Sequence, residues 1–144
     1  EAARESFERL RHKMNGQGSV LMQKQAPGEV ELILGALRDP QFGPCVMIGL
    51  GGKMAEFLQD SVFAVAPLDR EEALAAIGRL RSRTLLDGFR GAPPVDKGIL
   101  ASLMVTLGRI MVSLPRIGEI DINPIRVSGN SAVAVDATVV LDAP

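Results

Sequence analysis

The sequence contains no tryptophan or tyrosine, a single cysteine (Cys45) and a single histidine (His12). One cysteine excludes an internal disulfide framework and any cysteine-based zinc cluster, and it fits a reducing cytoplasm. Acidic and basic residues nearly balance, with a formal net charge of −1 and an isoelectric point near 5.9. Because no broad basic surface is available, we expect no nucleic-acid partner.

Long apolar runs are missing as well. The most apolar helical stretch, residues 99–114, is interrupted by serine, threonine, glycine and arginine, which is typical of a core helix rather than a membrane span. The N-terminal residues form a charged amphipathic pattern without the basic start and apolar middle of a secretion signal. We therefore expect no membrane association and a cytoplasmic location.

The chain does contain enough apolar residues for one core of ordinary size, since 47% of its 144 residues are hydrophobic. A single domain over residues 1–144 is the expectation. The sequence begins without methionine and inside a helical pattern, from which we expect a piece cut from a longer protein. Four methionines are expected to fill the core: Met47, Met54, Met104 and Met111.

Helical and strand-like patterns are mixed along the chain. Asp69 followed by Glu72 predicts the start of one helix, and Asp96 can cap another helix that Pro115 ends. Further helices are predicted within 1–14 and at 53–59, and strand-like runs are found at 19–26, 29–39, 44–50, 62–67 and on both sides of 128–131. The pattern predicts an α+β fold with a mostly antiparallel sheet covered by helices on one face.

The last strand pair, "GEIDINPIRVSGNSAVAVD" (118–136), contains the strongest functional signal. A two-residue turn at 129–130 pairs Ser128 with Ser131 and places Asn123 opposite Asp136. Side chains two apart along a strand share a face, so Asp121 and Glu119 continue the row. The reverse face is then predicted to be buried, with Ile120, Ile122, Val133, Val135, Ala137 and Val139.

This row of oxygen acceptors has two interpretations. It can be the outer face of an ordinary half-exposed hairpin, in contact with water. However, Glu119, Asp121, Asn123 and Asp136 have no cation beside them on the predicted face, and clustered carboxylates repel by about 1 kcal/mol per close pair. Hard oxygen ligands, few in number and supplemented by phosphate oxygens, are what Mg²⁺ accepts in nucleotide sites. The pattern therefore favours a magnesium site.

The segments "EIDINP" (119–124) and "AVD" (134–136) resemble the magnesium end of the ATP-grasp fold. More specifically, they resemble the ATP-grasp module of the ADP-forming acyl-CoA synthetases, relatives of succinyl-CoA synthetase. The segments 28–44, 49–60 and 85–96 fall in the family's order and at its spacing, so the resemblance covers the chain from about residue 20 onward. It implies that the chain is the C-terminal lobe (subdomain) of an ATP-grasp domain.

The resemblance also implies a set of ligand-binding residues. Asn123 and Asp136 would bind Mg²⁺, with Asp121 among its ligands or next to them. Glu31, four residues before a glycine that closes its strand, would contact the nucleotide.

A second implied contact is the segment "LMQK" (21–24), which would pass the adenine of ATP or ADP. Gln23 occupies the position that the synthetases commonly fill with glutamate, so it can form hydrogen bonds but brings no charge. Backbone groups of Met22 and Gln23 could serve the adenine edge whatever the side chains are.

The implied activity is phosphoryl transfer between ATP and an acyl phosphate or a phosphohistidine, with Mg²⁺ and ATP or ADP as cofactors. Nothing in the chain matches the N-terminal ATP-grasp lobe or the CoA-binding and ligase domains, which are the expected partners in the parent protein. The isolated chain is expected to be inactive, and none of its residues is assigned as catalytic. The alternative is a non-catalytic regulatory or structural synthetase-like module of a protein lysine acetyltransferase.

Other residues admit two interpretations each. The glycine turn at 49–52 could offer backbone N–H groups to phosphate or simply reverse the chain. Arg90 could clamp a phosphate or form a structural ion pair with a nearby aspartate. Glu56 could make a polar contact or face solvent. His12 and Cys45 are given no catalytic role, and Cys45 is interpreted as a small core residue.

Overall fold

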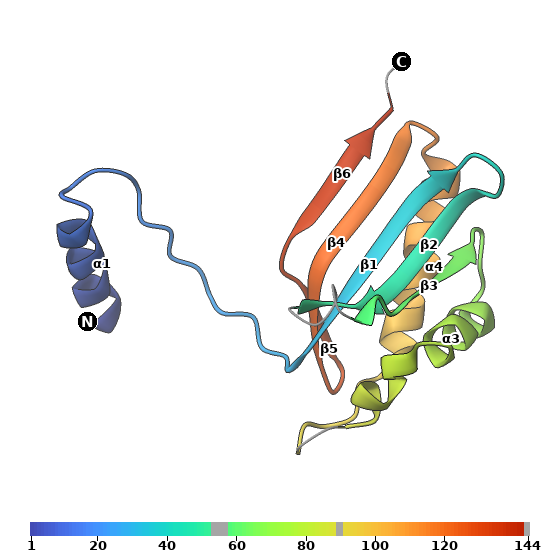
Figure 1. Cartoon of the computed structure of the whole chain (residues 1–144), viewed down its shortest axis with the longest axis horizontal. Coiled ribbons are helices and arrows are strands. Elements are labelled where there is room, and N and C mark those ends of the chain that lie inside the picture. The colour runs from blue at the N-terminus through green and yellow to red at the C-terminus, as the bar shows by residue number, and fades with distance from the viewer. Residues whose placement is uncertain (53–57, 89–90, 143–144) are drawn as a thin grey trace.

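The chain folds as an antiparallel sheet with helices packed on one face (Figure 1). The computed structural model describes residues 1–52, 58–88 and 91–142. Its elements are α1 (Ala2–Lys13), β1 (Val30–Asp39), β2 (Gly43–Leu50), β3 (Ser61–Val65), α3 (Arg70–Gly78), the 3-10 helix η2 (Arg81–Asp87), α4 (Lys97–Ser113), β4 (Ile117–Ser128), β5 (Ser131–Ala134) and β6 (Ala137–Leu141). The predicted α+β class with a mostly antiparallel sheet is confirmed.

Within the described residues the strand order is β3-β2-β1-β4-β5, and β6 also pairs with β4. All of these pairings are antiparallel. β5 pairs with the last residues of β4, and β6 pairs with the first residues of β4. The two short strands therefore lie one after the other along the same edge of β4.

The two helices that pack on the sheet begin as the sequence predicts. At the start of α3, the Asp69 carboxylate accepts the backbone N–H of Glu72 (2.9 Å), and the Glu72 carboxylate accepts the N–H of Asp69 (2.8 Å). At the start of α4, Asp96 accepts the N–H of Gly98 (2.8 Å). These caps satisfy backbone donors that have no partner inside the helix.

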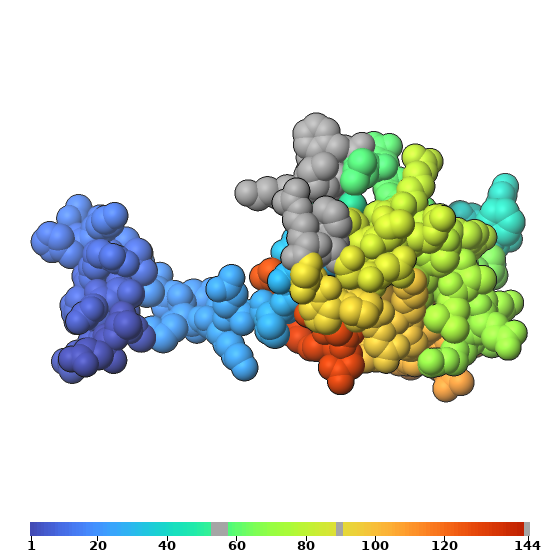
Figure 2. Space-filling view, turned by 90° about the horizontal axis from the view of Figure 1, so that it is seen from below, coloured from blue at the N-terminus to red at the C-terminus, as the bar shows by residue number. Residues whose placement is uncertain are grey.

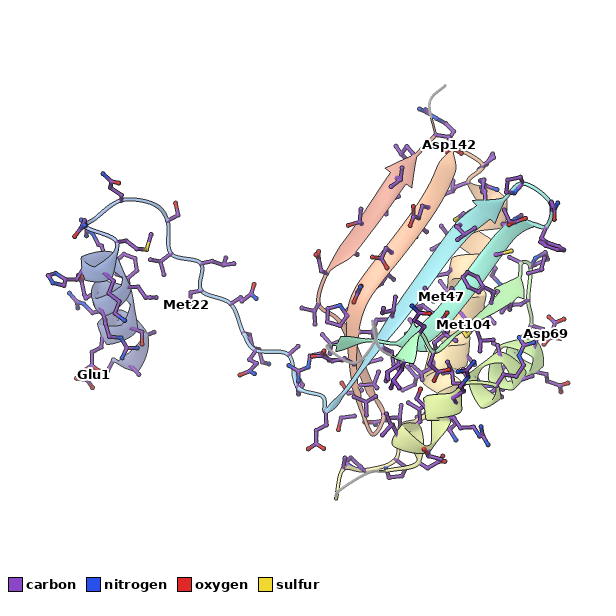
Figure 3. The ribbon with its side chains drawn as sticks, viewed as in Figure 1. Glu1, Met22, Met47, Asp69, Met104 and Asp142 are labelled. Atoms are coloured by element: carbon purple, nitrogen blue, oxygen red, sulfur yellow. The ribbon has the colours of Figure 1, made fainter. Side chains whose placement is uncertain are left out.

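The core lies between the sheet and helices α3 and α4. Alternate residues of the two central strands point to the helices, as the two-residue period of a strand requires. The largest fully buried side chains are Leu32, Ile48, Ile77, Leu80, Leu86, Leu100, Met104, Met111, Val46 and Val127. Met104 and Met111 fill the core as predicted, whereas Met47 is half-buried on the opposite face of the sheet (Figure 3), and Met54 lies outside the described residues.

The N-terminal part of the chain extends away from this body. α1 has no buried residue, and residues 19–29 run extended between α1 and the sheet without forming a strand (Figures 1 and 2). The predicted strand at 19–26 is therefore wrong, because its residues pair with no strand of the described chain. None of the described helices is long and apolar enough to cross a membrane.

Asp60, which directly precedes β3, links the sheet to the start of η2 by hydrogen bonds. It is the one buried polar or charged residue in the described part of the chain, with 7% of its surface exposed. Its carboxylate accepts the backbone N–H groups of Arg81 (3.0 Å) and Ser82 (2.7 Å). Burial alone would raise the pKa of Asp60, but the hydrogen bonds from Ser82 and Arg81, with the Arg81 charge, lower its pKa below the ordinary value.

Asp60→Asn is expected to lower the free energy of unfolding by about 1.5–3 kcal/mol at neutral pH, because hydrogen bonds to a charged group are lost. A lowered folded-state pKa makes this contribution present above the unfolded-state pKa and lost as pH falls through the folded-state pKa. The difference between wild type and variant should therefore shrink below about pH 4. Urea unfolding at pH 7 and pH 3 measures this difference in the free energy of unfolding.

The exposed carboxyl of Asp142 offers a control, and Asp142→Asn should change stability by less than about 0.5 kcal/mol at both pH values. A difference between wild type and Asp60→Asn that stays constant from pH 7 to pH 3 would contradict the assigned role.

Candidate functional site

The predicted site residues lie on the face of the sheet opposite α3 and α4. In β1, Leu32, Leu34 and Ala36 are buried toward the helices. Glu31 directly precedes Leu32 in the strand, so its side chain lies on the opposite, open face. In β4 the neighbours of the buried Ile120 do the same. This open face is the surface of the described body that the helices leave uncovered (Figure 1).

The predicted pairing of Asn123 with Asp136 is confirmed. Ser128 pairs with Ser131, and the same register continues through β5 and β6. Between the two strands, the Asn123 N–H donates to the Asp136 carbonyl (3.1 Å). Both residues are exposed, so a ligand from solvent can reach them.

Asp121 lies further along the same face of β4. It pairs with Thr138 of β6 on one side and with Gly35 of β1 on the other, and it is half-buried. Asp121, Asn123 and Asp136 therefore occupy neighbouring positions of β4 and of the segment that joins β5 to β6.

A bulge in β4 changes which side chains accompany this row. Leu34 pairs with Ile122 and Leu32 with Ile125, so Asn123 and Pro124 together lie opposite Ile33 alone. One extra residue on a strand reverses the alternation beyond it. Ile125 and Val127 are consequently the buried residues, with 2% and 1% of their surface exposed.

This reversal overturns two expectations for the last hairpin. The reverse face is not wholly buried: Val135 and Val139 are 46% and 53% exposed, because the bulge turns β5 over and β6 lies at the outer edge of the sheet. The expectation that the face with the oxygen acceptors has no cation is also wrong, because the bulge places Arg126 on the open face opposite Glu31. A proline inside a predicted strand was the available signal, because proline in a sheet marks edges and bulges.

Glu31 is held between Arg126 and the glycine turn. One carboxylate oxygen (Oε1) lies 3.7 Å from Arg126 Nε. A Cβ placed on Gly52, which has a φ of +72°, would lie 2.6 Å from the other oxygen. The Gly51 N–H donates to the Glu31 carbonyl (2.8 Å). The glycines at 51–52 thus have a structural reason to be present, which supports the turn interpretation.

Gln23 lines a shallow pocket of about 280 Å³ beside the open face. Its walls are the extended segment and the end of the hairpin, formed by Gln23, Lys24, Gln25, Ala26, Arg126, Val133, Ala134 and Val135. Met22 does not belong to this pocket and is 65% exposed on the extended segment (Figure 3). Gln23 therefore lines a pocket together with Arg126, which faces Glu31 in the strand register, and the Met22 side chain lies in solvent.

The donor set can be compared with the needs of Mg²⁺. Among the described residues no three His, Cys, Asp or Glu side chains lie close enough to hold a metal ion by themselves. Asn123 and Asp136 offer two oxygen ligands, and the Asp136 carboxylate is oriented by the Ala137 N–H (2.8 Å). Mg²⁺ commonly takes one or two protein oxygens and completes its shell with water and substrate phosphates, so these residues fit it.

The remaining candidates are structural or lie outside the described residues. Cys45 is buried between its partners in β1 and β3, and burial together with the nearby Asp39 raises the pKa of its thiol. A raised pKa disfavours the thiolate form of this cysteine. Arg90, Glu56 and most of the predicted helix at 53–59 lie outside the described residues.

The sequence profile of the ATP-grasp domain matches residues 1–141, and the chain belongs to this family. Among its relatives is the β subunit of acetate–CoA ligase [ADP-forming] I of Pyrococcus furiosus, which is 46% identical over 122 residues. The matched region is 85% of this chain and 53% of that subunit. The chain thus spans about half the length of this relative.

Two solved structures of the dinucleotide-forming acetyl-coenzyme A synthetase 1 of Ca. Korarchaeum cryptofilum share the fold. Its apo form matches with a TM-score of 0.81 and 40% identity, covering 97% of this chain and 66% of that one. Its complex with coenzyme A and Mg-AMPPCP matches with a TM-score of 0.78 and 44% identity. That match covers 81% of this chain and 55% of the synthetase chain. The resemblance to ADP-forming synthetases is confirmed, and these relatives give no support to the acetyltransferase alternative.

Proposed function

We propose that this chain is the nucleotide- and Mg²⁺-binding lobe of an ADP-forming acyl-CoA synthetase of the acetate–CoA ligase type. It would support phosphoryl transfer between ATP and an acyl phosphate or a phosphohistidine. The observation that carries the proposal is the pairing of Asn123 with Asp136 on an uncovered sheet face, in a chain 46% identical to an acetate–CoA ligase subunit.

In this proposal Asn123 and Asp136 hold Mg²⁺, with Asp121 as a further or neighbouring ligand. Mg²⁺ held by these residues would offset the charge that spreads over the phosphate oxygens during phosphoryl transfer. Asn123 is neutral, so the facing pair itself contributes one negative charge against the two positive charges of the ion. The Ala137 N–H holds the Asp136 carboxylate in place before the ion arrives.

The nucleoside end of ATP or ADP is assigned to Glu31 and to the extended segment. A carboxylate only accepts hydrogen bonds, so Glu31 suits a hydroxyl or amino group of the nucleotide rather than its phosphates. Backbone groups of Met22 and Gln23 would face the adenine edge, beside the pocket that Gln23 lines.

The proposal assigns the rest of the reaction to other parts of the protein. The N-terminal ATP-grasp lobe and the CoA-binding and ligase domains would supply the groups that hold the triphosphate, the acid and coenzyme A. The longer relatives support this assignment, because their matched regions are only part of their length. A cytoplasmic location fits a nucleotide-dependent ligase.

Calorimetric titration of ADP and ATP into the complete protein tests the proposal. Binding is expected in the presence of Mg²⁺ and is expected to weaken by at least about tenfold when EDTA removes the ion. At a nucleotide concentration 100 times the Kd, the native state should gain about 2.7 kcal/mol and its Tm should rise. Absence of binding, or equal binding with and without Mg²⁺, would refute the proposed function.

A further inference from the structure

We infer that Arg126 is a positioning residue of the nucleotide site. It holds the extended segment that contains Gln23 against the strand that contains Asn123, and it keeps the Glu31 carboxylate in place. This inference rests on the proposed function and deepens it, because it assigns a role to a residue outside the expected ligand set.

The first observation is the grip of Arg126 on the extended segment. Its Nε and Nη2 donate to the Gly28 carbonyl at 3.1 and 2.6 Å. In the described part of the chain, these two bonds are the hydrogen bonds that tie residues 19–28 to the sheet. The Arg126 side chain is 26% exposed, so the contact is partly shielded from water.

The second observation is that the backbone is shaped for this contact. Gly28 has a φ of +126°, and a Cβ on it would lie 2.9 Å from the Arg126 carbonyl carbon and from the Val127 nitrogen. Only glycine lets the chain pass so close to β4. The carbonyl that it presents is the one that Arg126 binds.

The third observation is that the same guanidinium faces Glu31. The two residues are directly opposite in the β1–β4 register, and Arg126 Nε lies 3.7 Å from Glu31 Oε1. Gly52 closes the other side of the carboxylate. Arg126 therefore contacts the extended segment, faces the nucleotide-binding carboxylate and forms part of the wall of the Gln23 pocket.

These contacts predict an effect on nucleotide affinity rather than on the chemical step. Without Arg126, the extended segment would have to be ordered when the nucleotide binds, and that ordering reduces affinity. A guanidinium can give two hydrogen bonds to one carbonyl while its charge faces Glu31. Lysine keeps the charge but lacks this fork, so it should restore only part of the function.

The test measures ADP binding and steady-state kinetics of the complete protein with Mg²⁺. Arg126→Met, which keeps the unbranched stem, is expected to raise the Kd and the KM for nucleotide by about tenfold or more. The kcat and the KM values for the acid and for coenzyme A should stay within about twofold. Arg126→Lys should lie between wild type and Arg126→Met. Arg109→Met, at an exposed arginine of α4, is the matched control and should match wild type.

A double-mutant cycle with Glu31→Gln adds a direct measure of coupling. The loss of affinity caused by Glu31→Gln should be smaller in the Arg126→Met background than in wild type, because Arg126 is what keeps the carboxylate in place. Additive effects of the two substitutions would overturn the link between Arg126 and Glu31.

A purely structural role gives the opposite kinetic pattern. If Arg126→Met only unfolds part of the protein, kcat falls with the amount of folded enzyme while the KM for nucleotide is unchanged, and the inference is overturned. An unchanged Kd for nucleotide in Arg126→Met also overturns it, while Mg²⁺-dependent binding by wild type leaves the proposed function standing. Absence of nucleotide binding by wild type would overturn both.

Discussion

Asp136→Ala is expected to weaken Mg²⁺-dependent binding of ADP by about 100-fold, which corresponds to about 2.7 kcal/mol. Asp136 supplies the one carboxylate of the facing pair. In the proposed site its replacement removes both a ligand oxygen and the charge that attracts the ion. The loss should appear in calorimetric titrations with Mg²⁺ present and should almost disappear in EDTA, where wild type and variant bind equally weakly.

Asn123→Ala should act in the same direction, since it removes the other proposed ligand oxygen. Glu119→Ala is the matched control, because Glu119 is an exposed carboxylate of the same strand and face that lies beyond Asp121. If Glu119→Ala and Asp136→Ala weaken binding equally, the effect comes from the general charge of the face and the two-ligand assignment is wrong. Equal nucleotide affinity of Asp136→Ala and wild type would also refute it.

Met104→Ala is expected to lower the free energy of unfolding by about 2–5 kcal/mol. Met104 is fully buried on α4, in the layer where this helix packs on the sheet (Figure 3). Truncation removes apolar contacts and leaves a cavity that the surrounding side chains fill only partly. Urea unfolding followed by circular dichroism measures the loss.

Met47→Ala provides the matched control for this substitution. Met47 is half-buried on the open face of β2, opposite Gly35 and Phe63 in the neighbouring strands. The same truncation at this position should cost less than about 1.5 kcal/mol, because fewer contacts are lost and no closed cavity forms. Equal losses for the two methionines would mean that both faces of the sheet are packed equally, which would contradict the described fold.

Local patterns in the sequence predicted much of the fold. The caps at Asp69 and Asp96 form as expected, because a cap depends on residues within one turn of each other. The register that places Asn123 opposite Asp136 follows from the two-residue turn alone, and Gly129 takes the left-handed conformation that such a turn needs (φ +55°). The amino-acid sequence is therefore sufficient to locate the facing pair.

The predicted strand at 19–26 is wrong because a strand depends on partners that are distant along the chain. Its residues have strand-like composition, but a strand exists only where a neighbour supplies hydrogen-bond partners. In the described chain the segment pairs with no strand, and the carbonyl of Gly28 is bound by a side chain instead. Composition alone could not show this.

The amino-acid sequence by itself determined the fold class, the helix starts, the hairpin register and the row of oxygen acceptors, since each depends on residues that are close along the chain. Only the tertiary structure decided which residues flank that row. Glu31 and Arg126 are 95 positions apart, and the pairing of β1 with β4 and the bulge at Asn123 and Pro124 bring them face to face. A one-residue bulge reverses the alternation of side chains beyond it, and that reversal puts a cation beside the carboxylates.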